Sequence, residues 1–159
     1  MSVDCELRVR PATRDDVADI SEMQKASLPE TYQPFLGRSA VERFIAAGSV
    51  ERYFEEHWHQ SIVATVDAEI VGVAVLLGEL IDLVWVKPSV RSRGIGAALM
   101  SQAERLASGS GELTLHVWSV NQRAVVVYER LGFSVREEMN DPATGLDKLV
   151  MRKPLEQDS

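Results

Sequence analysis

The feature that most constrains the fold is an apolar segment that leads through a glycine-containing turn into an amphipathic segment. Leu80–Val86 is mostly apolar, and the Lys87-Pro88 pair ends this run. Gly94 and Gly96 follow, and apolar residues then recur at helical spacing over 95–106. This order predicts a buried strand, a tight turn and a helix, as in a sheet that is covered by helices.

The glycine turn also predicts a ligand. Glycine allows a close approach to the backbone, and the first turn of a helix offers unpaired N–H groups and the positive end of the helix dipole. Arg91 and Arg93 add cations beside this turn. We therefore expect a phosphate or pyrophosphate there, and the alternative is a turn whose glycines serve geometry alone. A dinucleotide-binding fingerprint is incomplete because Leu99 occupies the position of its third glycine.

The rest of the chain alternates between strand and helix patterns. Thr13 and Asp16 predict a capped helix start, and Ser39 and Glu42 predict a capping box. Two prolines in 27–37 predict a loop there. We expect strands at 7–10, 61–66, 70–77, 80–86, 113–117, 133–136 and 146–152, and helices after Thr13, at 39–47, 50–57, 95–106 and 121–131.

Composition narrows the functional classes. The 159 residues include 17 Lys and Arg against 24 Asp and Glu, a net charge of −7, which argues against a nucleic-acid partner. The single cysteine, Cys5, excludes an internal disulfide and fits a reducing compartment. Asp4 and Glu6 stand where a signal peptide would be apolar, and runs such as Val71–Leu77 are too short to span a membrane.

These observations predict one cytoplasmic domain over 1–159, with a core at 6–153, a flexible polar tail at 156–159 and no membrane partner. No metal is expected, because His57 and His59 lack a third ligand nearby in the sequence.

Two motifs together resemble one family. Arg91-x-x-Gly94-x-Gly96 is similar to the pyrophosphate loop of the GNAT acyltransferases, and the segment 121–133 (NQRAVVVYERLGF) is similar to their N-x-x-A-x-x-x-Y-x-x-x-G-F stretch. The resemblance implies an α/β (α+β) fold with a mixed, mostly antiparallel central sheet of six to seven strands and helices on both faces. It also implies that the strands ending at Val86 and Val117 separate.

The resemblance further implies acetyl-CoA as co-substrate. Its pantetheine arm would bind the backbone of Val84 and Val86, its pyrophosphate would bind the N–H groups of 92–97, and Asn121 would contact the arm further along. The residues expected to bind coenzyme are Val84, Trp85, Val86, Arg91, Ser92, Arg93, Gly94, Ile95, Gly96, Ala97, Asn121, Ala124 and Tyr128.

Acyl transfer to an amine needs a proton donor for the thiolate, and the resemblance points to Tyr128. A phenol titrates near ~10 and a thiol near ~8.5, so a tyrosine is protonated at neutral pH. The alternative is an aromatic residue on the inner face of an amphipathic helix. The general base is open between His116, whose imidazole suits neutral pH, and the carboxylates Glu79 and Asp82. The resemblance also implies that a backbone N–H near Val84 stabilises the oxyanion.

The acceptor is the least determined part. By resemblance, Glu30, Tyr32 and Phe35 lie in a loop that walls the acceptor pocket, and the alternative is packing around the two prolines. We expect a small-molecule primary amine, with a protein N-terminus or lysine as the alternative and an inactive CoA-binding regulatory module as a second. Relatives in the family form homodimers, so a homodimer is possible.

Overall fold

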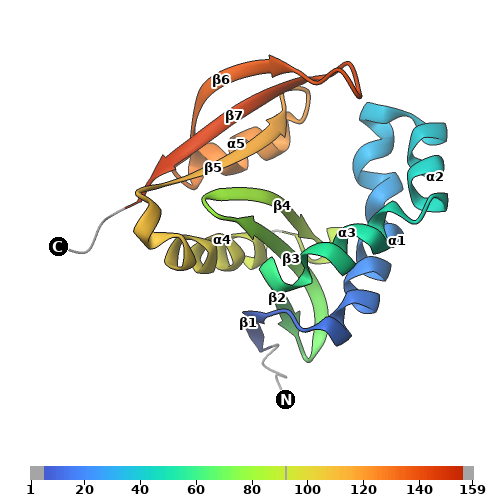
Figure 1. Cartoon of the computed structure of the whole chain (residues 1–159), viewed down its shortest axis with the longest axis horizontal. Helices are drawn as coiled ribbons and strands as arrows, with labels where there is room; N and C mark the ends of the chain where they lie inside the picture. Colours follow the sequence, from blue (N-terminus) through green and yellow to red (C-terminus); the bar gives the residue numbers. More distant parts are fainter. Residues whose placement is uncertain (1–5, 92, 156–159) are drawn as a thin grey trace. The chain divides into compact units, whose positions relative to one another are not determined.

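A computed structural model describes residues 6–91 and 93–155 of the chain (Figure 1). Cys5, Ser92 and the predicted tail at 156–159 lie outside the described residues. The strands are β1 (Leu7–Pro11), β2 (Ser61–Val66), β3 (Glu69–Leu77), β4 (Leu80–Val86), β5 (Glu112–Trp118), β6 (Ser134–Asn140) and β7 (Asp147–Pro154). The helices are α1 (Val17–Leu36), α2 (Arg38–Ala46), α3 (Ser49–His57), α4 (Ile95–Leu106) and α5 (Gln122–Arg130), and short 3₁₀ turns lie at Arg14–Asp16, Trp58–Gln60, Pro88–Val90 and Ser108–Ser110.

The strands form one sheet in the order β1-β2-β3-β4-β5-β7-β6. The pairs β1–β2, β2–β3, β5–β7 and β6–β7 are antiparallel, and β4–β5 is parallel, with Leu80 opposite Thr114 and Ile81 opposite Leu115. The predicted mixed, mostly antiparallel sheet is confirmed. The predicted separation of Val86 from Val117 stays a prediction.

The chain divides into two compact units, Met1–Val75 with Leu83–Met100, and Leu76–Asp82 with Ser101–Ser159. The single domain over 1–159 stays a prediction.

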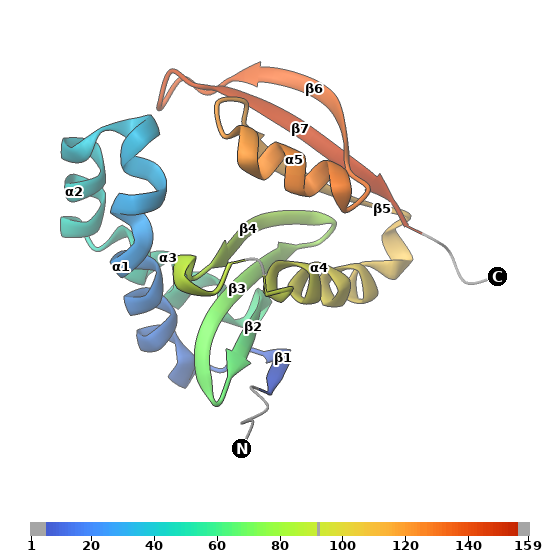
Figure 2. The same cartoon turned by 180° about the vertical axis from the view of Figure 1, so that it is seen from behind.

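In the first unit, α1 and α3 lie on one side of β2 and β3, and the first turns of α4 lie on the other (Figures 1 and 2). Ile95 and Leu99 of α4 pack on a buried cluster that includes Ile62 and Ala74. Gly72 of β3 permits this packing, because a Cβ there would lie 3.1 Å from both Ile95 Cγ2 and Leu99 Cδ1. The start of α4 is therefore seated directly on the sheet.

The predicted capped start after Thr13 is confirmed. Thr13 and Asp16 form a capping box, and the backbone N–H of Thr13 donates to Asp16 Oδ2 at 2.7 Å. Arg10 of β1 donates to both carboxylate oxygens of Asp16, at 2.7 and 3.0 Å. This guanidinium, helped by Thr13, lowers the pKa of Asp16 to about 2.

The predicted loop at 27–37 is wrong, because α1 continues through Pro29 and Pro34 to Leu36. Each proline removes one backbone donor from the helix. Tertiary contacts outweigh this loss: Leu28 is fully buried, and Ser27 is buried and bonded to a distant strand residue. The helix ends at Gly37, whose N–H donates to Gln33 O at 2.9 Å.

The predicted capping box at Ser39 and Glu42 is also wrong. Helix α2 begins at Arg38, one residue earlier, and Gly37 precedes it without a side-chain cap. Glu42 instead accepts from Arg38 Nε at 2.8 Å, an (i, i+4) ion pair on the exposed helix surface.

In the second unit, α5 lies beside β5 and β7 in both views (Figures 1 and 2). Leu113, Leu115 and Val117 alternate along β5 as its buried face, and Met151 opposite Leu115 is fully buried. Strand β6 is the edge of the sheet, and all its residues are exposed. The β6–β7 register shifts between Val135 and Glu137, so Arg136 is the extra residue of a β-bulge.

No helix within residues 6–91 and 93–155 is long and apolar enough to cross a membrane.

Candidate functional site

The predicted glycine turn leads directly into the first turn of α4. Gly94 has a φ of +79°, a left-handed conformation that favours glycine, and a Cβ added there would meet no atom of the described residues within 4 Å. The N–H of Ala98 donates to Gly94 O at 3.0 Å, which closes the first turn of α4. The N–H groups of 95–97 precede this bond, and N–H groups at such a position of a helix generally lack an acceptor within the helix and can bind an anion.

Two arginines stand on either side of residue 92 in this turn. Arg93 is exposed, and Arg91 is half-buried, with its Nη2 donating to Thr31 Oγ1 of α1 at 3.1 Å. A guanidinium is a strong partner for phosphate oxygens. Ser92 lies outside the described residues, so its predicted contact stays a prediction.

Side chains at the end of β4 pack into the first unit. Trp85 is buried, its Nε1 donates to Ser27 Oγ at 2.8 Å, and its ring meets the edge of Tyr32 at 5.2 Å between centroids. Burial raises the pKa of Tyr32. Trp85 and Ile95, both buried, can therefore offer a coenzyme only their backbone groups, whereas Val84 and Val86 are half-buried.

The residues predicted for the acceptor lie on helix α1 and not on a loop. Glu30 is exposed and lines a shallow hollow of about 540 Å³ with Pro29, Gln33 and Pro34. Tyr32 instead contacts Trp85, and Phe35 is half-buried one turn further along. Glu30 lines this hollow, whereas Tyr32 packs on Trp85, and the role of all three residues at an acceptor site stays a prediction.

In the second unit, Tyr128 belongs to the motif that ends α5. The N–H of Gly132 donates to Glu129 O at 3.0 Å, and the N–H of Phe133 donates to Tyr128 O at 3.0 Å. Gly132 has a φ of +102°, and the rings of Tyr128 and Phe133 pack edge to face. This is a Schellman motif with its apolar contact. The spacing of Tyr128, Gly132 and Phe133 is therefore explained by the way the helix ends, without any role for the tyrosine hydroxyl.

Asn121 also has a structural function. It is the N-cap of α5, and its Oδ1 accepts from the N–H of Ala124 at 3.3 Å. The other half of its amide could still contact a coenzyme, and this role stays a prediction for both Asn121 and Ala124.

The candidate bases lie on neighbouring strands. Leu80 of β4 pairs with Thr114 of β5, so Asp82 and His116, each two residues further along, project from the same face of the sheet. Both are exposed. Glu79 is exposed before β4, and its backbone carbonyl accepts from the N–H of Thr114 at 2.8 Å. The structure therefore brings two of the three candidates to one face.

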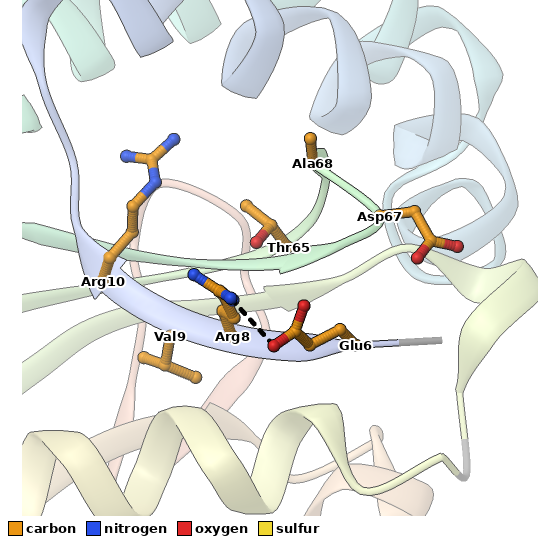
Figure 3. A pocket seen from close by; sticks show the side chains of 7 residues that line it. All are labelled: Glu6, Arg8, Val9, Arg10, Thr65, Asp67 and Ala68. Carbon is orange, nitrogen blue, oxygen red and sulfur yellow. Dashed lines mark hydrogen bonds and ion pairs between the residues drawn. The ribbon is translucent and has the colours of Figure 1, made fainter. Parts of the chain in front are cut away.

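Two other features, a hollow beside β1 and the pair His57 and His59, lie away from the glycine turn in the sequence. A hollow of about 750 Å³ lies beside β1 and the β2–β3 turn, where Figure 3 shows Val9 on the side of α4 and Arg10 on the opposite side. Its lining includes the exposed Glu6–Arg8 ion pair but no predicted site residue. His57 Nδ1 contacts Gln60 Oε1 at 2.9 Å, and within the described ranges no group of three potential metal ligands is found.

Comparison with known proteins decides the family. The acetyltransferase (GNAT) domain model matches residues 19–155. The chain belongs to this family. Peptidyl-lysine N-acetyltransferase YjaB of Salmonella typhimurium is 39% identical over 82 residues, 50% of this chain and 54% of that protein, and the Escherichia coli protein is 37% identical over 73 residues, 45% and 48%. The chain spans about half the length of the curated relatives that it matches.

Solved structures support the GNAT fold. The PaiA N-acetyltransferase of Thermoplasma acidophilum, solved in complex with coenzyme A, has a TM-score of 0.78 at 18% identity and covers 94% of this chain and 99% of its own. Apo YjaB of Escherichia coli has a TM-score of 0.74 at 21% identity, covering 95% and 99%. At these identities the likeness shows the fold alone. The predicted fold is thereby confirmed, and the match of the domain model confirms the predicted family.

Sequence reasoning missed three residues that shape this GNAT domain. Ser27 and Thr31 were assigned to the predicted loop, because the two prolines argued against the helix on which both residues lie. Gly72 was overlooked within an apolar strand. A lone glycine in such a strand indicates that another element approaches closely. This signal could have predicted that the start of α4 packs on β3 at Gly72.

Proposed function

We propose that the chain is an N-acetyltransferase that transfers an acetyl group from acetyl-CoA to the ε-amine of a lysine in a protein or peptide. The observation that carries the proposal is the glycine turn before α4, with its open N–H groups and flanking arginines, in a chain that belongs to the GNAT family. The lysine acceptor is supported by the two YjaB proteins, which are named peptidyl-lysine N-acetyltransferases.

The residues at the turn fit the diphosphate of coenzyme A. Gly94 and Gly96 present backbone without side chains, and among the described residues a Cβ at Gly96 would meet Val86 Cγ2 alone, at 3.9 Å. The N–H groups of 95–97 and the dipole of α4 favour negative charge there. Arg93 and Arg91 supply cations that a neutral turn would lack. Val84 and Val86 would hold the pantetheine arm through their backbone.

The chemistry assigns one task to each remaining group. The acceptor amine must be neutral to attack, so a base on the chain takes its proton, and His116 is our first candidate, ahead of Asp82 and Glu79. A backbone N–H near Val84 would donate to the carbonyl oxygen as it becomes negative. The Tyr128 hydroxyl would donate a proton to the departing thiolate. This transfer accompanies the collapse of the tetrahedral intermediate, in which the C–S bond breaks. The acceptor nitrogen gives up its remaining extra proton, which restores the tyrosine directly or through solvent, and an amide and free coenzyme A are left.

A small-molecule amine is the second candidate acceptor. One observation favours it: a nourseothricin acetyltransferase structure is 29% identical, with a TM-score of 0.55 over 60% of this chain. Its name specifies nourseothricin and not a peptidyl lysine. A homodimer and a cytoplasmic location stay predictions.

A thiol-release assay with acetyl-CoA tests the proposal. The acceptors are an Nα-blocked peptide with one lysine, the same peptide with arginine in place of lysine, an unblocked peptide without lysine, and a set of small amines. We expect release with the first peptide and not with its arginine control. Release with small amines alone would move the acceptor to that class. If calorimetry shows that the chain binds coenzyme A but no amine leads to thiol release from acetyl-CoA, the chain is an inactive CoA-binding module. That result would overturn the catalytic proposal.

A further inference from the structure

We propose that Thr31 is a positioning residue for coenzyme binding, because it holds the Arg91 guanidinium beside the glycine turn. This inference rests on the proposed function, since it takes the turn as the site of the coenzyme diphosphate. It adds a residue from α1 to a site otherwise built from β4 and α4.

The contact joins parts of the chain that are distant in sequence. Arg91 Nη2 donates to Thr31 Oγ1 at 3.1 Å, and the two residues are 60 positions apart. Both side chains are half-buried, so water competes less for this bond than on an open surface. A guanidinium carries five N–H donors, and a bond from Nη2 to a hydroxyl is compatible with a phosphate contact.

The rest of α1 fixes Thr31 in place. Ser27 lies one helical turn earlier on the same face and accepts from Trp85 Nε1 at 2.8 Å. Tyr32, next to Thr31, packs edge to face on the Trp85 ring. Three adjacent contacts thus attach this segment of α1 to the end of β4 and to the turn that follows it.

The physical effect is a reduction in the entropy that binding must overcome. An arginine side chain loses considerable rotamer freedom when it is held by a ligand. The Thr31 bond restricts Arg91 before a ligand arrives, so less freedom is lost on binding. Thr31 would therefore affect the affinity for phosphate-bearing ligands without touching them.

The test compares coenzyme A with pantetheine, which lacks phosphate groups, by titration of the full chain. Thr31→Val keeps the shape and removes the acceptor, and we expect a roughly 3- to 10-fold weaker Kd for coenzyme A with pantetheine binding unchanged. Thr31→Ser should restore the wild-type Kd. Thr144→Val makes the same substitution in the β6–β7 turn, where Thr144 Oγ1 bonds Asp141, and should leave both affinities unchanged.

A double-mutant cycle separates positioning from a general effect on the fold. If Thr31 acts through Arg91, then Thr31→Val should add nothing to the loss caused by Arg91→Ala. Three results would overturn the inference even if the wild-type chain binds coenzyme A. These are an equal loss of affinity for pantetheine and coenzyme A in Thr31→Val, an unchanged Kd in that variant, or additive effects of the two substitutions in the cycle. Failure of the wild-type chain to bind coenzyme A would instead overturn the proposed function.

Discussion

The Trp85 indole donates to the Ser27 hydroxyl at 2.8 Å, across 58 positions of sequence. Both side chains are buried, with exposed fractions of 4% and 5%. The bond therefore fixes α1 against the last residues of β4 inside the first unit, where water cannot replace either partner.

Ser27→Ala should lower the free energy of unfolding by about 1–3 kcal/mol, because it leaves a buried indole N–H without its acceptor. Urea denaturation measures this loss. Ser39→Ala, on the exposed surface of α2, is the matched control and should change the free energy by less than about 0.5 kcal/mol. Equal effects of the two variants would show that the Trp85 bond contributes nothing.

The Arg10–Asp16 pair should make stability depend on pH in acid. The pKa of Asp16 is lowered from 3.8 to about 2 in the folded chain, chiefly by its hydrogen bond with Arg10. The carboxylate therefore stabilises the fold fully above pH 4, and this contribution is lost as pH falls from about 4 to 2. The shift corresponds to about 2 kcal/mol, and partial exposure of Arg10 reduces it to about 1–2 kcal/mol.

Denaturation of Asp16→Asn at several pH values tests this dependence. We expect the difference from wild type to be largest near pH 5 and to shrink by about 1–2 kcal/mol by pH 2. Asp15→Asn, an exposed neighbour in the same turn, should differ from wild type by less than about 0.5 kcal/mol. A constant Asp16→Asn difference across this range would contradict the assigned role of the pair.

Gly96→Ala should stabilise the chain while weakening its binding of coenzyme A. The new methyl would meet Val86 at an ordinary distance of 3.9 Å, and alanine favours a helix over glycine by roughly 0.5–1 kcal/mol. The same methyl would occupy the surface that the diphosphate approaches, so we expect Kd to rise roughly tenfold or more. Thermal denaturation and calorimetry measure the two effects. Unchanged affinity would place the diphosphate elsewhere.

Tyr128→Phe should lower kcat at least roughly 100-fold and change the Kd for coenzyme A by less than about twofold. The substitution keeps the ring contact with Phe133 and the backbone carbonyl of the Schellman motif, so the fold should persist. Thiol release under saturating acetyl-CoA gives kcat. Wild-type turnover in this variant would leave Tyr128 with only its helix-ending function.

His116→Ala should remove the acidic limb of the pH profile of kcat/KM, whereas Asp82→Asn should retain it. A base must be deprotonated to act, so its loss eliminates the fall in rate at low pH. The reverse pattern would assign the base to Asp82. Retention of the limb in both variants would show that neither residue is the base.

The sequence predicted elements well where local signals and burial agree. The segment of three consecutive valines in α5 has poor helix propensity, yet Gly132 at the expected C′ position correctly predicted the helix. The glycine turn and the start of α4 were likewise predicted, because their geometry depends on residues close in sequence.

Prediction failed where distant contacts decide the local structure. Pro29 and Pro34 are strong local signals against a helix, and α1 continues because of tertiary contacts, which include those with Trp85 and Arg91 far along the chain. The acceptor residues were consequently assigned to a loop. Their true arrangement on a helix could not be deduced without knowing which strand α1 packs on.

The bulge at Arg136 has a consequence for the chain in concentrated solution. An edge strand that is straight and apolar offers its free backbone groups to strands of other molecules, which is how many proteins begin to aggregate. Strand β6 is bent by its extra residue and carries Arg136, Glu137 and Glu138 in succession. Side-by-side association through this strand would need to straighten the backbone and desolvate its charges, so the outer edge protects the molecule from uncontrolled polymerisation.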